Sequence, residues 1–561
     1  MATLSLNPQK ELTLKDHVKA RAATMLALVD CEKAEWHEIA LYSGYPITDG
    51  LISNQAGRRR PKSRALYDGH SIRVFRYVES GLYSGNSSPN RPWFNFALKR
   101  DRGGQSTATQ ATKVWFGTCV SILSMIFAGS NFYRVVRSNY GQLGRFGNAA
   151  AIMDDDDEFG INCIGLKIGE FACDVNRKGK VDTLLRWVQM TTRQLVDGYV
   201  RQLDGSMDWS LVHPSVQSAW NSSNYTATFT VYHLIEPNSE YREGAWAAAG
   251  MKWRSVKWME CDTDKSRLLE NLGYIEQPFW VARWAVDGTD VWATGPGRDA
   301  LPDMRELQAQ SKRKGEVTDM VVKPPTQGPR DFRMRPGQHT ALASVDAGKV
   351  EVVYQAPYQA IGLVGSDVQE CRRAISEATY ADLFMAITER DGVQPLNDLE
   401  TQLRNDEKMT QLGPVIESIN VDMLKVAVER AFGIALRASP PLFPPPPEEL
   451  EDEELDIEFI SVLAQAQKMM GAGQTERSLA FVGAVSQFQP DAIDLVDGDA
   501  LVRDHWERSA APAVGMRDQS VVDQIRANRQ QQQQQERMAA MAQPAKAGVE
   551  AAALLNEIGQ Q

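Results

Sequence analysis

Cysteine is scarce in this sequence, and its spacing excludes most metal and redox chemistry. Six cysteines occur among 561 residues, and no two of them form a C-x-x-C pair. They are too scattered for a zinc site and too few for a disulfide scaffold. We interpret them as buried thiols of a protein that works in a reducing compartment.

Long hydrophobic runs are missing as well. The longest apolar stretch lies around residues 119–129, far below the about 18 residues that a membrane span requires. No charged and then apolar leader opens the chain. With 43% hydrophobic and 24% charged residues, the composition is that of a globular protein. The sequence predicts a soluble, unexported protein without membrane contact, long enough for roughly three or four domain-sized units.

Catalytic and cofactor motifs are also absent. No G-x-x-x-x-G-K-[ST] phosphate loop occurs, and the run Gly141–Gly147 lacks the lysine that such a loop needs. His37-Glu38 is not followed by a second histidine one turn later, which excludes the H-E-x-x-H zinc motif. The seven histidines are dispersed, so we expect them to serve surface or core packing. The sequence predicts no cofactor, no metal and no enzymatic activity.

One acidic run, Asp154–Glu158, leaves an alternative open. Five adjacent carboxylates could bind hard cations, as those of two-metal nucleases do. Adjacent acids in a loop between strands point in different directions, however, so we interpret the run as a solvated loop. A metal-dependent nuclease that uses Asp154–Glu158 is kept as a less favoured alternative.

The net charge of −11 argues against a protein that coats nucleic acid, because such binding depends on neutralising phosphates. Basic residues nevertheless cluster at Arg58–Arg64 and again between Lys312 and Arg335. We interpret both clusters as solvated faces or as ion-pair partners within an oligomer rather than as DNA-binding surfaces. Glu448–Glu458 holds eight acids in eleven residues and follows a proline-rich stretch, which predicts a linker.

Hydrophobic periodicity predicts an α+β fold with an antiparallel sheet. A turn is expected at Asp174–Lys180, with Asn176 and Gly179. The predicted helices before the middle of the chain cover residues 14–42, 111–143 and 182–196, and the predicted strands cover residues 161–173, 225–235, 252–261 and 279–292.

The middle of the chain has a different pattern. A charged helix over residues 300–314 precedes a turn-rich segment with short strands near 317–322 and 349–354, and a second helix covers 357–387. This order predicts a stalk with a small tip. A helix pair this polar buries little surface alone, so it requires identical neighbours around it, which predicts a ring.

A turn-forming run over residues 81–94 ends in two aromatic residues that should pin it to an apolar surface. Its second half resembles the "SPSRPWF" motif of the head-to-tail connector (portal) proteins of short-tailed, podovirus-type phages. The residues that carry the motif are Ser88, Pro89, Arg91, Pro92, Trp93 and Phe94. Further similar segments follow in family order: Ser130–Tyr133, Phe146–Ala149, Gly179–Asp182, Thr192–Leu195, Arg283-Trp284, Leu301–Asp303, Lys323–Pro325, Pro336-Gly337, Asp382–Phe384, Leu412–Val415 and Ile460–Gln467.

Two segments depart from the family pattern. Trp292–Gly297 stands where the family has "YGRGP", and Pro395–Asp398 stands where it has "TATE". The second departure falls in the segment that the resemblance assigns to the channel loop, so the local shape of that loop differs from the family pattern.

The resemblance implies a portal fold, with an α/β wing, a helical stem, a small α/β clip and a helical crown, assembled as a ring with a central channel. The implied domains are the wing (1–297 and 389–437, with the channel loop at 390–397), the stem helices (298–316 and 357–388), the clip (317–356), a Pro-rich and acidic linker (438–457), the crown (458–517) and a C-terminal helix or flexible tail (518–561). The glutamine tract Gln530–Gln535 could extend a helix begun near Ser520 or be disordered when free.

The resemblance also implies a function. Twelve copies would form a homo-oligomeric ring at the unique portal vertex of the virion, assembled in the host cytoplasm, through which double-stranded DNA is packaged and ejected. The implied partners are the terminase large subunit, tail adaptor or nozzle proteins, scaffolding and major capsid proteins, and possible internal core proteins. Another virion structural protein, such as a tail tube or adaptor, is the main alternative.

Three groups of residues are candidates for function. The candidate DNA-channel or clip contacts are Lys312, Arg313, Lys314, Arg330, Arg333 and Arg335. The channel loop would present Arg390, Asp391, Gln394 and Asn397 at the narrowest point. The motif residues, from Ser88 to Phe94 together with Arg283 and Trp284, would be structural. Because dense lysines would hold DNA and stall it, we expect a channel wall that is acidic or neutral with isolated basic rings.

Overall fold

The computed structural model describes residues 8–45, 66–99, 109–156, 160–202, 204–242, 244, 250–262, 264, 267–327, 351–354, 357–388, 412–450, 455–460, 479, 481–485, 488, 496–502 and 521–535. The chain divides into two compact units. Unit 1 comprises Met1–Phe94, Val120–Phe443 and Phe459–Gln467, and unit 2 comprises Asn95–Cys119, Pro444–Glu458 and Lys468–Gln561.

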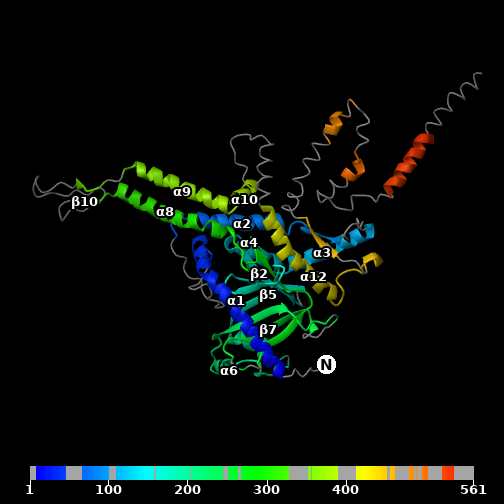
Figure 1. Cartoon of the computed structure of the whole chain (residues 1–561), viewed down its shortest axis with the longest axis horizontal. Helices are drawn as coiled ribbons and strands as arrows, with labels where there is room; N and C mark the ends of the chain where they lie inside the picture. Colours follow the sequence, from blue (N-terminus) through cyan, green and yellow to red (C-terminus); the bar gives the residue numbers. More distant parts are fainter. Residues whose placement is uncertain are drawn as a thin grey trace, which may run out of the picture. The chain divides into compact units, whose positions relative to one another are not determined.

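Two antiparallel sheets form the centre of unit 1 (Figure 1). The first has the order β3-β2-β9, with β2 at Asn148–Asp156, β3 at Gly160–Leu166 and β9 at Phe279–Arg283. The second has the order β4-β5-β6-β7-β8, at Phe171–Val175, Val181–Thr191, Thr228–Pro237, Trp253–Met259 and Glu270–Tyr274. The predicted mixture of helices with an antiparallel sheet is therefore confirmed.

The helix predicted over residues 182–196 is wrong. Most of that segment is strand β5, and only Thr192–Leu195 forms a short helix, α5, which continues into the π-helix η1 at Val196–Val200. β5 lies between β4 and β6, so both of its edges are paired, and this pairing overrides the local helical pattern. The helix starts where Thr191 and Gln194 form a reciprocal capping box.

The strand predicted over residues 161–173 is two strands, β3 and β4. A turn between them has its Gly169 at φ +86°, a conformation that glycine adopts without steric cost. The turn predicted at Asp174–Lys180 is confirmed, because the Asn176 side chain accepts hydrogen bonds from the backbone N–H groups of Lys178 and Lys180. Gly179 has φ +76° in that turn.

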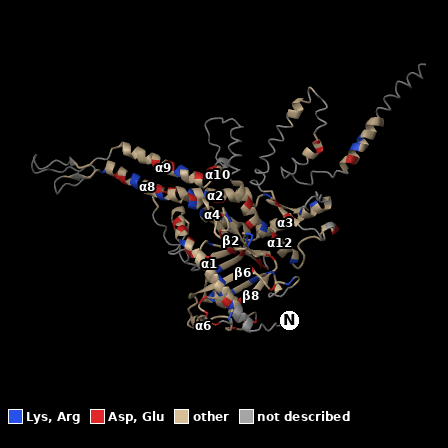
Figure 2. Ribbon diagram, in the orientation of Figure 1, with Lys and Arg blue, Asp and Glu red and all other residues tan. Residues whose placement is uncertain are grey.

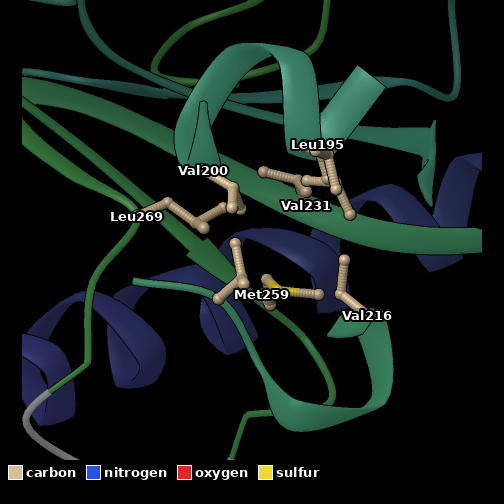
Figure 3. Packing of buried hydrophobic residues seen from close by; sticks show 8 residues of the cluster. Leu195, Val200, Val216, Val231, Met259 and Leu269 are labelled. Carbon is tan, nitrogen blue, oxygen red and sulfur yellow. The ribbon is translucent and has the colours of Figure 1, made fainter. Parts of the chain in front are cut away.

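One face of the five-stranded sheet is covered by α5, η1 and the short helix α6 at Pro214–Asn221. Figure 3 shows how their apolar side chains converge on residues of the sheet. Leu195 and Val216 lie against Val231 and Met259, and all four are buried. This cluster holds the helical layer on the sheet through the burial of apolar surface.

The first two helices of the described chain are α1 and α2. α1 at Pro8–Ser43 confirms the predicted first helix, and α2 spans His70–Asn86. The predicted turn-forming run is therefore wrong over residues 81–86, which are helical. Val74, Val78 and Leu82 are fully buried on α2, and this burial offsets the low helix propensity of the glycines and serines.

The single helix predicted over residues 111–143 is two helices, α3 at Gln110–Gly129 and α4 at Phe132–Phe146. Asn131 separates them because its side chain bonds strand β3. Its Nδ2 donates to the Asn162 side chain at 2.8 Å, and its Oδ1 accepts the N–H of Cys163 at 2.8 Å. A side chain that is engaged with a neighbouring strand in this way favours a helix break.

Among the described residues, one helix segment, Ala111–Gly129, has the length and hydropathy of a membrane span, with a mean hydropathy of 1.5. This corrects the expectation that the apolar run is far too short. The core helix of a soluble protein passes the same test, and Leu123 and Phe127 of this helix are fully buried.

The predicted stalk is a helical hairpin within unit 1. α8 spans Leu301–Val322 and follows the short α7 at Pro296–Asp299, and α9 spans Gln359–Ala378 and precedes α10 at Ala381–Thr388. The strand predicted near 317–322 is wrong, because α8 continues until the prolines after Lys323. The strands are β10 at Thr326–Gln327 and β11 at Glu351–Val352, and the second confirms the strand predicted near 349–354.

The remaining elements follow the hairpin. Residues 412–419 are helical and lead through the π-helix η3 at Asn420–Leu424 into α12 at Lys425–Arg437. The 3₁₀ turn η4 at Glu448–Leu450 and the first four residues of strand β12 at Leu455–Phe459 fall in unit 2 and within the acidic run. β12 pairs with β1 at Phe94–Leu98. Residues 521–535 are helical, which is one of the two alternatives that the sequence left open for the glutamine tract.

Candidate functional site

Among the described residues, the α8/α9 hairpin lacks a covering partner over much of its length. α8 and α9 lie side by side and extend away from the sheets of unit 1 (Figure 1). No described residue is buried in 309–327 or in 357–367. The exposed apolar side chains in these two ranges and in the described segment 351–354, between 45% and 80% accessible, are Met320, Val322, Val352, Val353, Tyr354, Tyr358 and Leu363. A hairpin of this kind provides a surface for association.

Charged residues of both signs lie along the hairpin (Figure 2). Lys312, Arg313 and Lys314 are exposed on α8, and the Lys312 Nζ lies 3.8 Å from the Glu316 carboxylate. The other three predicted contacts, Arg330, Arg333 and Arg335, lie outside the described residues. The same is true of the predicted channel-loop residues Arg390, Asp391, Gln394 and Asn397 and of the basic run 58–64.

A buried polar latch holds the base of the hairpin to the segment before α2. The Gln308 amide oxygen accepts the backbone N–H groups of Tyr67 and Asp68 at 2.8 and 3.1 Å, and its Nε2 donates to the Asp68 carbonyl at 2.9 Å. From α9, Arg372 donates to the Asp68 carboxylate at 2.6 Å. His70 Nε2 lies 3.1 Å from the Arg372 carbonyl. The two hairpin helices are thus tied to one short segment.

The latch sets the protonation of its two titratable groups. Burial raises the pKa of Asp68, but the hydrogen bonds from Arg372 and from the backbone N–H of His70 outweigh it, so the pKa lies below its ordinary value. Burial lowers the pKa of His70. At neutral pH the latch therefore contains an ionised Asp68 and a neutral His70.

A second set of contacts ties α1 to the start of the hairpin. Arg298 Nε lies 2.8 Å from the Glu35 carboxylate, and Arg305 makes a bidentate ion pair with Glu38. The hydrogen bond from Arg305 lowers the pKa of Glu38, which keeps that carboxylate ionised. A bidentate guanidinium–carboxylate pair fixes orientation as well as distance.

The predicted motif segment is pinned by its aromatic residues, as expected. Trp93 is 2% exposed and stacks on Phe132 with ring centroids 6.3 Å apart, and its Nε1 donates to the Tyr133 hydroxyl at 3.2 Å. Phe94 is fully buried. The preceding motif residues are more open, since Ser88 is half-buried and Pro89, Arg91 and Pro92 are exposed.

Arg283 joins three elements of unit 1. It is buried at the end of β9, donates to the Gly179 carbonyl at 2.7 Å, and has its Nε 3.7 Å from the Asp422 carboxylate of η3. Its neighbour Trp284 is buried and lies 6.2 Å from the Tyr380 ring. The sequence motif located Arg283 but missed Asp422, because the two residues are far apart in the chain.

The π-helix η3 contributes a second buried contact. Asn420 accepts a hydrogen bond from the Asn86 side chain at 3.1 Å. Ser87 follows Asn86 in the chain, and its hydroxyl lies 2.9 Å from the Tyr140 hydroxyl. A π-helical turn shifts the register of the side chains around it, and such turns occur often at functional sites. Here η3 places Asn420 and Asp422 against residues of α2 and β9.

The acidic run does not form a metal site in the described residues. Asp154 and Asp155 lie in strand β2 rather than in a loop, which corrects the prediction. Asp154 accepts a hydrogen bond from the Tyr274 hydroxyl at 2.8 Å, and Asp155 is ion-paired with Arg430. Among the described residues no group of three histidine, cysteine or acidic side chains is placed to hold a metal ion. Nothing in this geometry supports the nuclease alternative.

The cysteines are free thiols, and four of the six are buried. The two exposed ones are Cys31 and Cys261, so the prediction of buried thiols is correct for most of the set. Burial raises the pKa of the Cys119, Cys163 and Cys173 thiols to about 12. These three groups remain protonated and unreactive at neutral pH.

Comparison with known proteins identifies relatives along most of the chain. The family model described as bacteriophage head to tail connecting protein matches residues 15–516. The probable portal protein of Bordetella phage BPP-1 is 29% identical and covers 94% of this chain and 92% of its own. The portal protein of Salmonella phage epsilon15 is 31% identical and covers 89% of this chain and 88% of its own.

Two solved assemblies show a distant likeness. The virion of a native gene transfer agent particle has a TM-score of 0.33 at 9% identity, covering 74% of this chain and 86% of the matched chain. The neck of an empty gene transfer agent particle has a TM-score of 0.34 at 9% identity, covering 72% and 85%. These likenesses are too distant to assign a function. The family match and the two phage relatives confirm the resemblance that the motifs predicted, and this chain belongs to the family of bacteriophage head-to-tail connecting proteins.

Proposed function

We propose that twelve copies of this structural head-to-tail connector form a closed ring at one vertex of a phage capsid. The ring surrounds a channel through which double-stranded DNA enters during packaging and leaves during ejection. The observation that carries this proposal is the uncovered part of the α8/α9 hairpin, which has no buried residue in 309–327 or 357–367. Identical neighbours in a cyclic ring cover such a surface without leaving an open end.

The hairpin is the stem in this proposal, and the segment 317–356 at its far end is the clip. The clip docks the terminase large subunit during packaging and the tail adaptor afterwards. The sheets of unit 1 belong to the wing, and the segments 458–517 and 518–561 form the crown and its extension. Capsid and scaffolding proteins contact the wing during assembly in the host cytoplasm. The latch of Gln308, Asp68 and Arg372 holds the stem to the wing.

The proposed role is structural rather than enzymatic. The relatives are portal proteins, which are not enzymes. A portal ring contributes a channel and docking surfaces, and the packaging motor supplies the chemical energy. A tail tube or adaptor remains a weaker alternative, because the family match and both relatives point to the head-to-tail connector.

The mass of the purified protein in solution tests this proposal. Light scattering should give about 750 kDa, twelve times 62.4 kDa, and negative-stain images of the same peak should show rings with an axial hole. A chain that stays monomeric even with the capsid and scaffolding proteins present would contradict the proposal. A ring of another size would keep the portal function and correct the subunit number.

A further inference from the structure

One edge of the α8/α9 hairpin is acidic. Asp303 and Glu306 lie one turn apart on α8, and Asp367 and Glu370 lie one turn apart on α9. Buried Cys371 lies near this group. Its thiol pKa is raised by burial and then by the negative charges of Glu306, Asp303 and Asp367. We call these four acids the acidic edge.

None of the four acids of the acidic edge forms an ion pair among the described residues. The ion pairs of the hairpin there involve other acids, namely Glu38 with Arg305, Glu316 with Lys312, Asp68 with Arg372 and Glu377 with Arg373. Burial and then the nearby Glu306 raise the pKa of Asp303. Carboxylates that raise each other's pKa repel one another, and a cation brought close to them would relieve that repulsion.

The side of α8 that faces away from the acidic edge carries Lys312. Lys312 follows Arg305 by seven residues and so shares its face, whereas Asp303 is turned about 160° from Arg305. The Lys312 side chain is 55% exposed, and its contact with Glu316 is an exposed pair within one helix. Such pairs contribute little stability, so Lys312 can exchange this partner for another.

Lys312 and Asp367 of α9 lie at nearly the same level of the hairpin. Cys371 lies at the level of Asp303 and Glu306, because it is close to both. Asp367 precedes Cys371 by four residues, which places it about 6 Å nearer the tip. Lys312 follows Glu306 by six residues and lies about 9 Å nearer the tip. Lys312 and Asp367 therefore lie on opposite edges of the hairpin, at nearly the same height.

We propose that the acidic edge of one copy packs against Lys312 of the next copy around the ring. The inference rests on the proposed ring. Rotation about a ring axis brings opposite edges of neighbouring copies together at the same height when the hairpin runs along that axis. Leu363 is 68% exposed and shares a face with Asp367 and Glu370, at i, i+4 and i+7. Contact with the neighbour buries Leu363 and gives the uncompensated acids a cation.

Charge reversal tests this contact in the full-length chain. The variant Lys312→Glu and the double variant Asp367→Lys/Glu370→Lys should each lower the fraction of protein in rings at least tenfold at about 0.1 M salt, as measured by light scattering. Combining all three substitutions should restore rings, because the contact then forms with its signs exchanged. Arg373→Glu is the matched control, because Arg373 is an exposed residue of α9 that forms the same kind of i, i+4 ion pair, with Glu377, and has no part in the proposed contact.

The outcomes separate this inference from the proposed function. Loss of rings in Lys312→Glu and in the double variant, recovery in the triple variant and intact rings in Arg373→Glu support the contact. Intact rings in Lys312→Glu overturn it and leave the portal proposal standing. A triple variant that stays as dissociated as the double variant also overturns it, provided that circular dichroism shows each chain folded. A wild-type chain that forms no ring at all contradicts the portal proposal itself.

Discussion

Titratable side chains that are buried in unit 1 make the free energy of unfolding depend on pH. His233 is fully enclosed in strand β6, where its Nε2 lies 2.8 Å from the Ser255 hydroxyl. Burial lowers the pKa of His233 well below 6.5, and the positive charges of Lys257 and Arg186 lower it further. Folding therefore holds this imidazole neutral at a pH where the unfolded chain already binds a proton.

Stability should fall as the pH drops below the ordinary histidine pKa of about 6.5. The unfolded state gains a proton there and the folded state does not, so each further pH unit costs about 1.4 kcal/mol for this one group. His233→Gln should reduce the loss of unfolding free energy between about pH 6.5 and about pH 5.5, as measured by urea denaturation. An unchanged slope in the variant would show that other groups cause the acid sensitivity.

The sequence could identify some of these residues but not their partners. The family motifs pointed to Arg283 and Trp93. The contacts of Arg283 with Gly179 and Asp422 join three distant segments. Such partners depend on how the chain closes, and one sequence without the fold does not specify them.

At the level of elements, two glycines show how much a helix depends on its surroundings. A Cβ atom on Gly297 in α7 would lie 2.0 Å from the backbone oxygen of Arg145 at the end of α4. Backbone atoms cannot move aside as a flexible side chain can. A Cβ on Gly315 in α8 would meet nothing within 4 Å.

Gly297→Ala should destabilise the chain by about 2 kcal/mol, because overpacking of this kind costs roughly 1–3 kcal/mol. Gly315→Ala should instead stabilise α8 by up to about 1 kcal/mol, because alanine has the higher helix propensity. Chemical denaturation of the two variants measures both effects. Destabilisation by Gly315→Ala would indicate that a neighbouring copy approaches α8 at that position.

Elements with strong local signals were predicted well, and elements that depend on pairing were not. The pattern of α1 is a local signal, and α1 and the starts of the two hairpin helices occur close to where periodicity placed them. α8 nevertheless continues through the residues predicted as a strand, and the second predicted helix is divided into α9 and α10. β5 was expected to be a helix because its sequence pattern is ambiguous. Hydrogen bonding to its two neighbours, β4 and β6, makes this segment a strand, and β6 lies more than thirty residues further along the sequence.

At the level of the whole molecule, the charge of the chain bears on how DNA would pass through the proposed ring. Each copy carries −11, so such a ring would repel the DNA phosphates overall. Every phosphate that a protein neutralises adds to its hold on DNA and to the salt dependence of binding. A conduit works best when this hold is weak.

The purified ring should therefore retain no linear double-stranded DNA at about 200 mM salt, and only weak binding should remain at about 50 mM. Filter binding at the two salt concentrations measures this, with a basic DNA-binding protein as the positive control. Tight retention at about 200 mM would contradict the expectation of an acidic or neutral channel wall with isolated basic rings.

The sequence by itself determined the family, the mixed helix and sheet class, and the helical hairpin, because each of these depends on local motifs or on hydrophobic periodicity. Tertiary structure alone decided that β5 is a strand, that α3 and α4 are separate, and that Asp155 pairs with Arg430. These features rest on contacts between segments far apart in the chain. Their free energy arises only when folding brings both partners together and removes them from water.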